Sequence, residues 1–185
     1  MGVQGGETVG YGQPVGTHNF LIEGVSGTGK TSVCHELRQR GFHAINGDTD
    51  LAYQGDPESG EPIVGDPSHD QHIWRIDQVR ALAADGRERF TFFCGGSRNF
   101  TQFLDLFDEV FVLEIDTATL IQRLARRPTD EFGAKPSERD SILRLHGTRG
   151  DIPQKGIGID ASAPLSDVVD EILNHAEMIA TTKGA

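Results

Sequence analysis

Positive charge is scarce in this chain. Its 185 residues include 17 lysines and arginines against 28 aspartates and glutamates, which gives a formal net charge of -11. A nucleic-acid binder normally meets the phosphate backbone with a basic face, so this deficit argues against a nucleic-acid partner. Solubility is the simpler explanation of the acidic excess.

Cysteine is scarce too, and long apolar runs are absent. The two cysteines, Cys34 and Cys94, lie far apart in the sequence and do not have the spacing of metal ligands. This pattern argues against a disulfide framework and gives no support for a zinc site. No segment is apolar over the length of a membrane span, and the first residues lack the basic and apolar regions of a secretory signal. We therefore expect a soluble cytoplasmic protein with no membrane partner.

Apolar side chains are also few at the start of the chain. The first sixteen residues, MGVQGGETVGYGQPVG, are rich in glycine and cannot offset the entropy that is lost on ordering. We treat residues 1–17 as a flexible tail or an expression remnant. Residues 18–185 have the size of one domain, and the 36% hydrophobic content of the chain is enough for one core.

What the chain does contain is an alternation of short apolar runs with longer stretches of helical period. This alternation is typical of a parallel sheet covered by helices, so we expect an α/β fold. The expected strands are residues 19–23, 43–46, 89–94, 109–115 and 157–160. Helices are expected to include residues 33–37, 73–83, 100–107, 120–124 and 168–179, and another opens near Ser137. Residues 51–72 are rich in Gly, Pro and Asp, and we expect a mobile substrate lid there.

The most specific feature lies between the first expected strand and the first expected helix. It matches the phosphate-binding pattern G-x-x-x-x-G-K-[ST] and consists of Gly24, Val25, Ser26, Gly27, Thr28, Gly29, Lys30 and Thr31. Glycines let such a loop curl until its backbone N–H groups point inward, and the following helix adds the positive end of its dipole. Lys30 would reach the β- and γ-phosphates, and the Thr31 hydroxyl would complete a Mg2+ shell. The pattern predicts a site for ATP or GTP, with an ordinary glycine turn as the alternative.

With this loop, the chain resembles the P-loop kinases of small molecules, a group that includes adenylate, shikimate, gluconate and nucleoside kinases. The resemblance runs from Phe20 to about Ile172. It implies a three-layer P-loop NTPase fold, with a five-stranded parallel sheet in the order 2-3-1-4-5 and helices on both faces. It also implies that the loop and the adjoining Ser32 contact the nucleotide.

A second point of resemblance is the acidic run Gly47-Asp48-Thr49-Asp50, which is similar to the acidic pair of shikimate kinases and the Gly-Asp of gluconate kinases. In those families such carboxylates support the magnesium shell or orient the acceptor hydroxyl. We assign Asp48 to the metal and Asp50 to the acceptor, because the hydroxyl must align with the γ-phosphate and lose its proton. Alternatively, both carboxylates only cap a loop or turn.

A third point is Arg123-Leu124-Ala125-Arg126-Arg127, which looks like the R-x-x-x-R of adenylate-kinase-like proteins. Arg123 and Arg127 are four residues apart and therefore share one helical face. The resemblance implies that Arg123 stacks on the base, that Arg127 clamps the transferring phosphates, and that residues 128–136 form a lid over ATP. Arg126 lies between them and could take the place of either arginine. Alternatively, this basic run binds no nucleotide and is only an exposed helix end that complements the helix dipole.

Ligands of open α/β sheets bind beyond the carboxyl ends of the strands. After the third expected strand the chain has Gly95, Gly96 and Arg98, where many P-loop proteins have a magnesium-supporting aspartate. A turn of small residues would let the acceptor approach, and Arg98 would suit an acceptor with a phosphate or carboxylate. A tight turn with a solvated Arg98 is the alternative. Ala161 lies in a loop that resembles the one bordering the adenine in these kinases.

The sequence is least specific about the acceptor. Tyr53 and Trp74 flank the 51–72 segment and would offer aromatic platforms to a nucleoside or nucleotide, although a lone tryptophan more commonly belongs to the core. We expect a phosphotransferase that moves the γ-phosphate of ATP to such an acceptor, acting as a monomer or homodimer. A gluconate-type sugar-acid kinase and a nucleotide-binding regulator with slow or no hydrolysis are the alternatives.

Overall fold

A computed structural model describes residues 17–129 and 131–183 of the chain. The tail expected at residues 1–17 lies outside the described residues except for its last position. Position 130, within the expected lid at residues 128–136, also lies outside them. In the described ranges, no helix combines the length and the hydropathy that crossing a bilayer requires.

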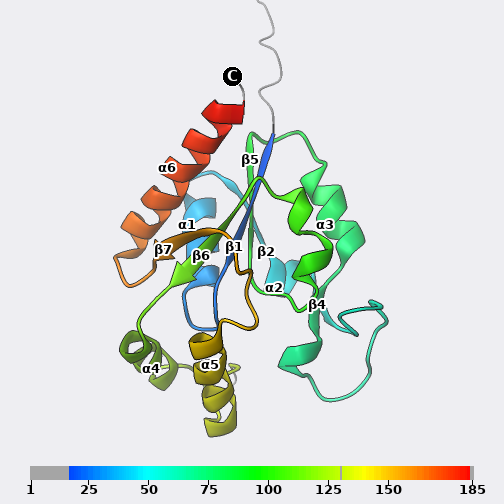
Figure 1. Ribbon diagram of the computed structural model, residues 1–185, viewed down its shortest axis with the longest axis vertical. Coiled ribbons are helices and arrows are strands. Elements are labelled where there is room, and N and C mark those ends of the chain that lie inside the picture. Colours follow the sequence, from blue (N-terminus) through cyan, green and yellow to red (C-terminus); the bar gives the residue numbers. More distant parts are fainter. Residues whose placement is uncertain (1–16, 130, 184–185) are drawn as a thin grey trace, which may run out of the picture.

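The elements alternate between strands and helices, as the sequence predicted (Figure 1). The first half contains β1 (His18–Glu23), α1 (Lys30–Gln39), β2 (His43–Asn46), α2 (Gly47–Asp50), β3 (Ala52–Gln54), η1 (His69–Gln71), β4 (His72–Trp74) and α3 (Ile76–Ala83). The second half contains β5 (Phe90–Cys94), η2 (Phe100–Gln102), η3 (Leu104–Leu106), β6 (Glu109–Glu114), α4 (Thr117–Ala125), α5 (Pro136–Thr148), β7 (Ile157–Asp160) and α6 (Leu165–Lys183).

Five parallel strands form the central sheet in the spatial order β2-β5-β1-β6-β7. Counted along these five strands alone, the order is 2-3-1-4-5, as the resemblance implied. β1 is the middle strand, and its Ile22 aligns with Cys94 of β5 and with Phe111 of β6. The loop after β1 therefore begins at the centre of the sheet, at the edge where all five strands end.

The strands are apolar on both faces because helices cover both sides of the sheet. In Figure 1, α1 and α6 lie on one side and α3 lies on the other, while α4 and α5 stand beyond the carboxyl ends of the strands. Phe20, Phe92 and Phe111 are fully buried in three strands, and the Phe20 ring centroid lies 5.4 Å from that of Phe92 and 5.6 Å from that of Phe111. A strand buried on both faces has a continuous apolar sequence, which made these strands recognisable.

Local signals set the starts of the helices beside the site. α1 begins at Lys30 directly after Gly29, whose φ of 108° is in the left-handed region that glycine favours. α4 is capped by Asp116, whose carboxylate accepts a hydrogen bond from the Thr119 backbone N–H at 2.9 Å. Pro136 occupies the first turn of α5, where its missing N–H costs nothing.

Two expectations about secondary structure are wrong. Residues 100–107 form the two 3-10 turns η2 and η3 rather than one helix, although Phe103 is fully buried. Ile73 belongs to β4, where it pairs with Tyr53 of β3 in an antiparallel hairpin instead of opening a helix. In both cases a long-range contact overrides the local period: the Phe103 ring stacks on Trp74 at 5.6 Å, and β3 pairs with β4.

The segment at residues 51–72, where a mobile lid was expected, makes many hydrogen bonds within itself. The Tyr53 hydroxyl donates to the carbonyl of Gly60 at 2.7 Å, and the Ser68 N–H donates to the Gln54 side chain at 2.8 Å. The Gly55 N–H donates to the carbonyl of Gln71 at 2.9 Å. These bonds return the end of the segment to its start, beside the carboxyl edge of the sheet.

Candidate active site

The loop between β1 and α1 has the backbone geometry of a phosphate cradle. Gly24, Gly27 and Gly29 all have positive φ, at 150°, 100° and 108°. A Cβ on Gly24 would lie 2.8 Å from the Leu113 carbonyl, and one on Gly27 would lie 2.8 Å from the side chain of Leu120. Conformation therefore favours glycine at all three positions, and limited space adds to this at Gly24 and Gly27. The curl leaves backbone N–H groups available at the start of α1, where the helix dipole also favours an anion.

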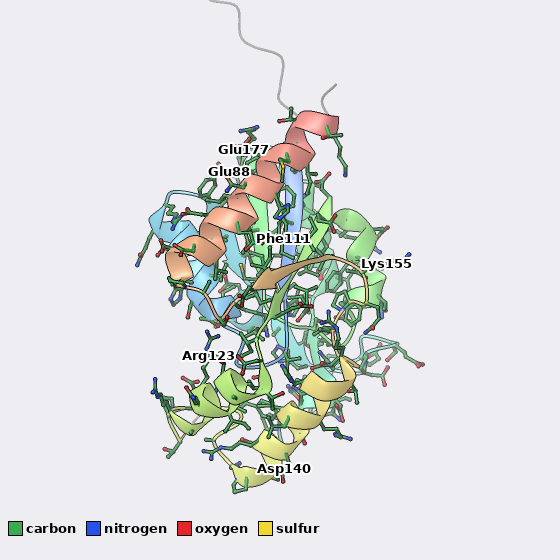
Figure 2. The ribbon with its side chains drawn as sticks, turned by 60° about the vertical axis from the view of Figure 1, so that its left-hand side comes forward. Glu88, Phe111, Arg123, Asp140, Lys155 and Glu177 are labelled. Carbon is green, nitrogen blue, oxygen red and sulfur yellow. The ribbon has the colours of Figure 1, made fainter. Side chains whose placement is uncertain are left out.

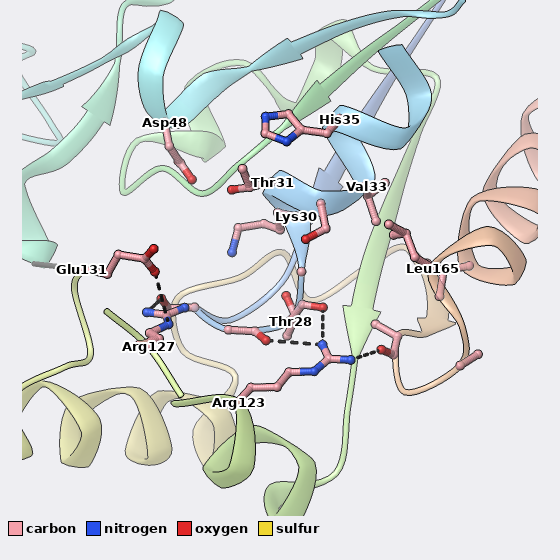
Figure 3. A pocket seen from close by; sticks show the side chains of 17 residues that line it. Thr28, Lys30, Thr31, Val33, His35, Asp48, Arg123, Arg127, Glu131 and Leu165 are labelled. Carbon is pink, nitrogen blue, oxygen red and sulfur yellow. Dashed lines mark hydrogen bonds and ion pairs between the residues drawn. The ribbon is translucent and has the colours of Figure 1, made fainter. Parts of the chain in front are cut away.

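A cavity of about 700 Å³ opens over this loop (Figure 3). Its wall includes ten of the residues that the sequence assigned to the nucleotide: Ser26, Gly27, Thr28, Gly29, Lys30, Thr31, Ser32, Arg123, Arg127 and Ala161. Val25 is buried and does not line this cavity. The Lys30 ammonium donates to the carbonyl of Gly24 and, at 3.3 Å, to that of Val25, so it lies within the curl of the loop.

The two arginines of the R-x-x-x-R run reach the loop from α4 and from the residues just after it. Arg123 extends from the end of α4 toward the sheet (Figure 2). It donates to the carbonyl of Thr28 at 2.9 Å and to that of Ala161 at 2.6 Å (Figure 3). Arg127 donates to the Ser26 hydroxyl at 3.1 Å and to the Phe132 carbonyl. Arg123 thus joins the phosphate loop to the loop after β7, and Arg127 joins it to the segment expected to be a lid.

Asp48 lies on α2, opposite the loop, and faces the cavity. Its carboxylate accepts a hydrogen bond from the Gly96 N–H at 3.1 Å and lies 3.2 Å from the ring nitrogen Nε2 of His72. Burial acts to raise the pKa of Asp48, but the His72 contact and the charge of Lys30 outweigh it and hold the pKa below its ordinary value. Asp48 is therefore ionised at neutral pH.

A second cavity, of about 320 Å³, adjoins the first. It is lined by residues from several distant parts of the chain: Glu23, Gly24, Ser26, Lys30, Asp48, Gln54, Pro67, Ser68, His69, His72, Gly96, Arg98, Phe132 and Asp151. Arg98 thus faces this cavity, as the sequence suggested. Its guanidinium donates to the Asp151 carbonyl at 2.7 Å and lies 3.6 Å from the Asp151 carboxylate.

Glu23 is the deepest carboxyl group of the second cavity. It ends β1, is 1% exposed, and accepts a hydrogen bond from the Gly24 N–H at 3.1 Å through Oε1. Its other oxygen, Oε2, has no hydrogen-bond partner among the described residues. Burial raises the pKa of Glu23 to about 8, although the charges of Lys30 and Arg98 act in the opposite direction. A buried carboxyl group with a free oxygen and a raised pKa is a candidate for proton transfer.

Comparison with known families agrees with this geometry. The model of the family described as AAA domain matches residues 21–144, which is more than half of the chain. The chain belongs to the AAA domain family. No curated protein matches it.

Solved structures place this AAA domain protein among proteins of the P-loop kinase fold. A gluconokinase from Sinorhizobium meliloti 1021 is 22% identical, with a TM-score of 0.55 over 89% of this chain and 94% of that chain. A shikimate kinase from Bacteroides thetaiotaomicron is 12% identical, with a TM-score of 0.52 over 86% and 98%. A deoxyadenosine kinase from M. mycoides with bound dATP is 15% identical, with a TM-score of 0.51 over 85% and 98%. These likenesses confirm the α/β P-loop fold expected from the sequence.

Three residues assigned to the acceptor from the sequence of this AAA domain protein lie away from both cavities. Asp50 pairs with Arg38 at 3.1 Å, and its side chain is 45% exposed. The Tyr53 ring lies under the guanidinium of Arg75, 4.8 Å from the ring centroid, and Trp74 is fully buried against Phe103. The reason at Asp50 is that Gly47–Asp50 is a helical turn, on which residues two apart point to different sides. Asp48 faces inward, and Asp50 consequently faces the solvent.

Gly95 lines neither of these two cavities, but it supports the second. Its φ is 148°, and a Cβ there would lie 2.7 Å from the Asp48 carboxylate and 2.8 Å from the Trp74 ring. The neighbouring Gly96 lines the second cavity, where a Cβ would lie 3.0 Å from Oε1 of Glu23. These glycines let both carboxyl groups approach the end of β5. The turn predicted after this strand therefore needs small residues, because larger side chains would displace these carboxyl groups.

Asp151, His69 and Phe132 were not assigned from the sequence, yet all line the second cavity. The His69 and Phe132 rings stack at 5.2 Å with an angle of 4° between their planes, and His69 lies 3.4 Å from the Asp151 carboxylate. This stack joins the 51–72 segment to the 128–136 segment, so the two expected lids meet at this cavity. Sequence reasoning had no signal for Asp151, but Glu23 was visible as the one charged residue at the end of the apolar run FLIE.

The residues of the first cavity fit a magnesium ion. The Thr31 hydroxyl and the Asp48 carboxylate both line this cavity and appear near each other in Figure 3, and oxygen ligands are those that Mg2+ prefers. In the described ranges no group of three or more His, Cys, Asp or Glu side chains is placed to hold a metal. A magnesium ion here would consequently need oxygen ligands from the phosphates of a nucleotide, which is its usual mode in kinases.

Proposed function

We propose that this protein is a magnesium-dependent phosphotransferase that moves the γ-phosphate of ATP to a hydroxyl group of a small acceptor. The observation that supports this most directly is the contact between the two cavities. Ser26, Lys30 and Asp48 line both of them. A donor held by the phosphate loop would therefore present its terminal phosphate at the mouth of the second cavity, where an acceptor has room to bind.

The residues of the first cavity bind the donor and the magnesium ion in this proposal. The loop N–H groups and Lys30 bind the donor phosphates, and Arg127 stabilises the charge that develops on the transferring group. Thr31 and Asp48 would hold the magnesium ion, which supplies positive charge against the phosphates when bound. Arg123 keeps the loop in shape through its two backbone contacts at 2.9 and 2.6 Å.

On the acceptor side, Glu23 takes the task that the sequence suggested for Asp50. The acceptor hydroxyl oxygen bonds to the γ-phosphorus, the bond from that phosphorus to the bridging oxygen breaks, and ADP leaves. The hydroxyl proton passes to the Glu23 carboxylate, whose Oε2 has no other partner in the described part of the chain. Because the pKa of Glu23 is about 8, the ionised form that can take this proton increases as the pH rises toward that value.

A nucleoside or nucleotide is the acceptor class that we propose. The second cavity, at about 320 Å³, is at the lower end of the range of roughly 300–1,000 Å³ for small-ligand pockets, and Phe132 supplies aromatic surface on its wall. A gluconate-type sugar acid is the alternative acceptor. The similar solved structures include both a gluconokinase and a deoxyadenosine kinase, so the fold does not choose between the two acceptor classes.

The deciding experiment incubates the protein with ATP, Mg2+ and a panel of nucleosides, nucleotides and sugar acids, and measures release of ADP. We expect release that depends on one acceptor class and is lost in Lys30→Ala. Replacing ATP by GTP tests the choice of donor. Nucleotide binding without turnover for any acceptor would instead indicate a nucleotide-binding regulator.

The cytoplasmic location and the monomeric or homodimeric state remain predictions, to be tested by fractionation and light scattering.

A further inference from the structure

We propose that Asp151 neutralises Arg98 within the second cavity, so that this cavity selects an uncharged hydroxyl compound over an acid or a phosphate monoester. The inference rests on the proposed function, because it concerns the acceptor of the same transfer. It also reverses the expectation from the sequence that Arg98 suits an anionic acceptor.

The first step is the balance of charge on the cavity wall. The wall has three carboxyl groups, from Glu23, Asp48 and Asp151, and two permanent cations, from Lys30 and Arg98. Lys30 also lines the first cavity and lies within the phosphate loop, so it serves the donor. Arg98 is thus the one permanent cation left for an acceptor on the described wall.

The second step is that Arg98 already has an anionic partner. Its guanidinium lies 3.6 Å from the Asp151 carboxylate and donates to the Asp151 carbonyl at 2.7 Å. The two side chains are 14% and 4% exposed, so solvent screens this pair little. The Arg98 backbone is also fixed, because its N–H donates to the His72 carbonyl at 2.9 Å. An anion approaching Arg98 would meet the Asp151 carboxylate at close range.

The third step concerns the two histidines of the wall. His72 lies 3.2 Å from the Asp48 carboxylate, which would match a proton on its ring. His69 lies 3.4 Å from the Asp151 carboxylate and shares it with Arg98, so Asp151 neutralises Arg98 fully while the His69 ring is uncharged. Burial acts to raise the pKa of Asp151, but the His69 contact and the charge of Arg98 outweigh it and hold the pKa below its ordinary value. Asp151 is ionised at neutral pH, as the neutralisation requires.

What the wall offers instead is suited to hydroxyl groups. The Gln54 side-chain amide keeps two N–H donors that have no partner in the described residues, because only its oxygen is used, by the Ser68 N–H. The Ser68 hydroxyl can donate and accept, and Glu23 has a free oxygen. Pro67 and Phe132 supply apolar surface between these groups. This set matches a ribose or another neutral sugar better than a carboxylate or phosphate.

The test compares matched pairs of compounds that differ only in charge. The protein is first saturated with Mg2+ and a non-hydrolysable ATP analogue, and that binding is measured. Adenosine and adenosine 5′-monophosphate, then glucose and gluconate, are titrated by calorimetry. We expect the neutral member of at least one pair to bind at least tenfold more tightly. Tighter binding of the anionic members, or no binding of any member, overturns the inference. Failure to bind the ATP analogue would instead overturn the proposed function.

Asp151→Asn provides the direct test of the neutralisation. The amide keeps the size of the side chain but frees the charge of Arg98, so the anionic member should gain at least tenfold in affinity relative to the neutral one. Asp85→Asn is the matched control, because Asp85 also pairs with an arginine, Arg87, and lines neither cavity described here. An unchanged preference in a folded Asp151→Asn protein overturns the inference.

Arg98→Gln keeps the inference testable if Asp151→Asn does not fold. Removing Arg98 leaves the Asp151 carboxylate without its partner, so the neutral member should still be preferred and anion binding should weaken further. An anionic member that binds as tightly as its neutral partner in folded Arg98→Gln would overturn the inference. Circular dichroism and the melting temperature establish that each variant is folded.

Discussion

The two cavities of this protein are built in different ways. The donor cavity is lined in large part by one continuous stretch, Ser26 to Val33, which brings its own backbone donors and its lysine. The acceptor cavity is assembled from the ends of β1 and β5, from the 51–72 segment, from Phe132 and from Asp151. A continuous motif can be recognised in a sequence, whereas an assembled site depends on contacts that only the fold defines. The predictions below test whether this division also holds for function.

Lys30→Ala should have the largest effect, because it removes the one side-chain cation that lies within the donor loop. We expect phosphate transfer to fall by about 10³-fold or more, the range found when a charge-stabilising group of a phosphate site is lost. Acceptor binding by calorimetry should change little, since other residues form most of that cavity. Transfer that continues at the native rate would remove the donor cavity from the mechanism.

Glu23→Gln should have the next largest effect. The amide occupies the same space but cannot take the acceptor proton, so we expect kcat to fall by about 10²- to 10⁴-fold while ATP binding is retained. In the native protein, kcat/KM should rise with pH until about pH 8, where Glu23 loses its proton. The variant should lack this rise. A pH profile that is the same in both proteins would assign the proton to another group.

The same substitution has a consequence for stability. The pKa of Glu23 rises from 4.5 to about 8 on folding, so between these pH values the folded state binds more protons than the unfolded state. The free energy of unfolding of the native protein therefore falls as the pH rises through this window, by an amount on the order of a few kcal/mol. Glu23→Gln should remove this contribution. Thermal melts of both proteins at pH 5 and pH 8 should show a smaller decrease for the variant.

The difference between a continuous motif and an assembled site also explains which parts of the two cavities could be predicted from the sequence. The loop residues and the five strands were predictable because their signals are local: glycine spacing, a lysine before a helix, and continuous apolar runs. Asp48 and Asp50 could not be separated, because which of them faces the site depends on the single helical turn α2. Asp151 and Arg98 are 53 residues apart, and no local pattern shows that they meet. Trp74 became a core residue because the β3–β4 hairpin turns it toward Phe103.

Phe132→Ala should have a moderate effect limited to the acceptor cavity. The change removes the ring that stacks on His69 at 5.2 Å. It therefore weakens the contact between residues 51–72 and residues 128–136 at this cavity. An aromatic pair contributes about 0.5–1.5 kcal/mol, so we expect the KM for the acceptor to rise by roughly 3- to 10-fold. The KM for ATP should stay nearly unchanged. Val64→Ala is the control, because Val64 is fully exposed in the 51–72 segment. A rise confined to the KM for ATP would assign the stack to the donor cavity.

Asp50→Asn should have the smallest effect, and it separates the assignment made from the sequence from the one that the fold supports. Asp50 pairs with Arg38 on the surface, where both side chains are nearly half exposed, so losing the pair should cost about 0–1 kcal/mol of stability. Transfer should remain within about twofold of the native rate, because the side chain faces away from both cavities. Asp48→Asn is the matched variant on the same helical turn, and its activity should fall far more. If Asp50→Asn instead abolished transfer while Asp48→Asn did not, the turn would have to rotate in the working enzyme, and the acceptor site would lie on its other side.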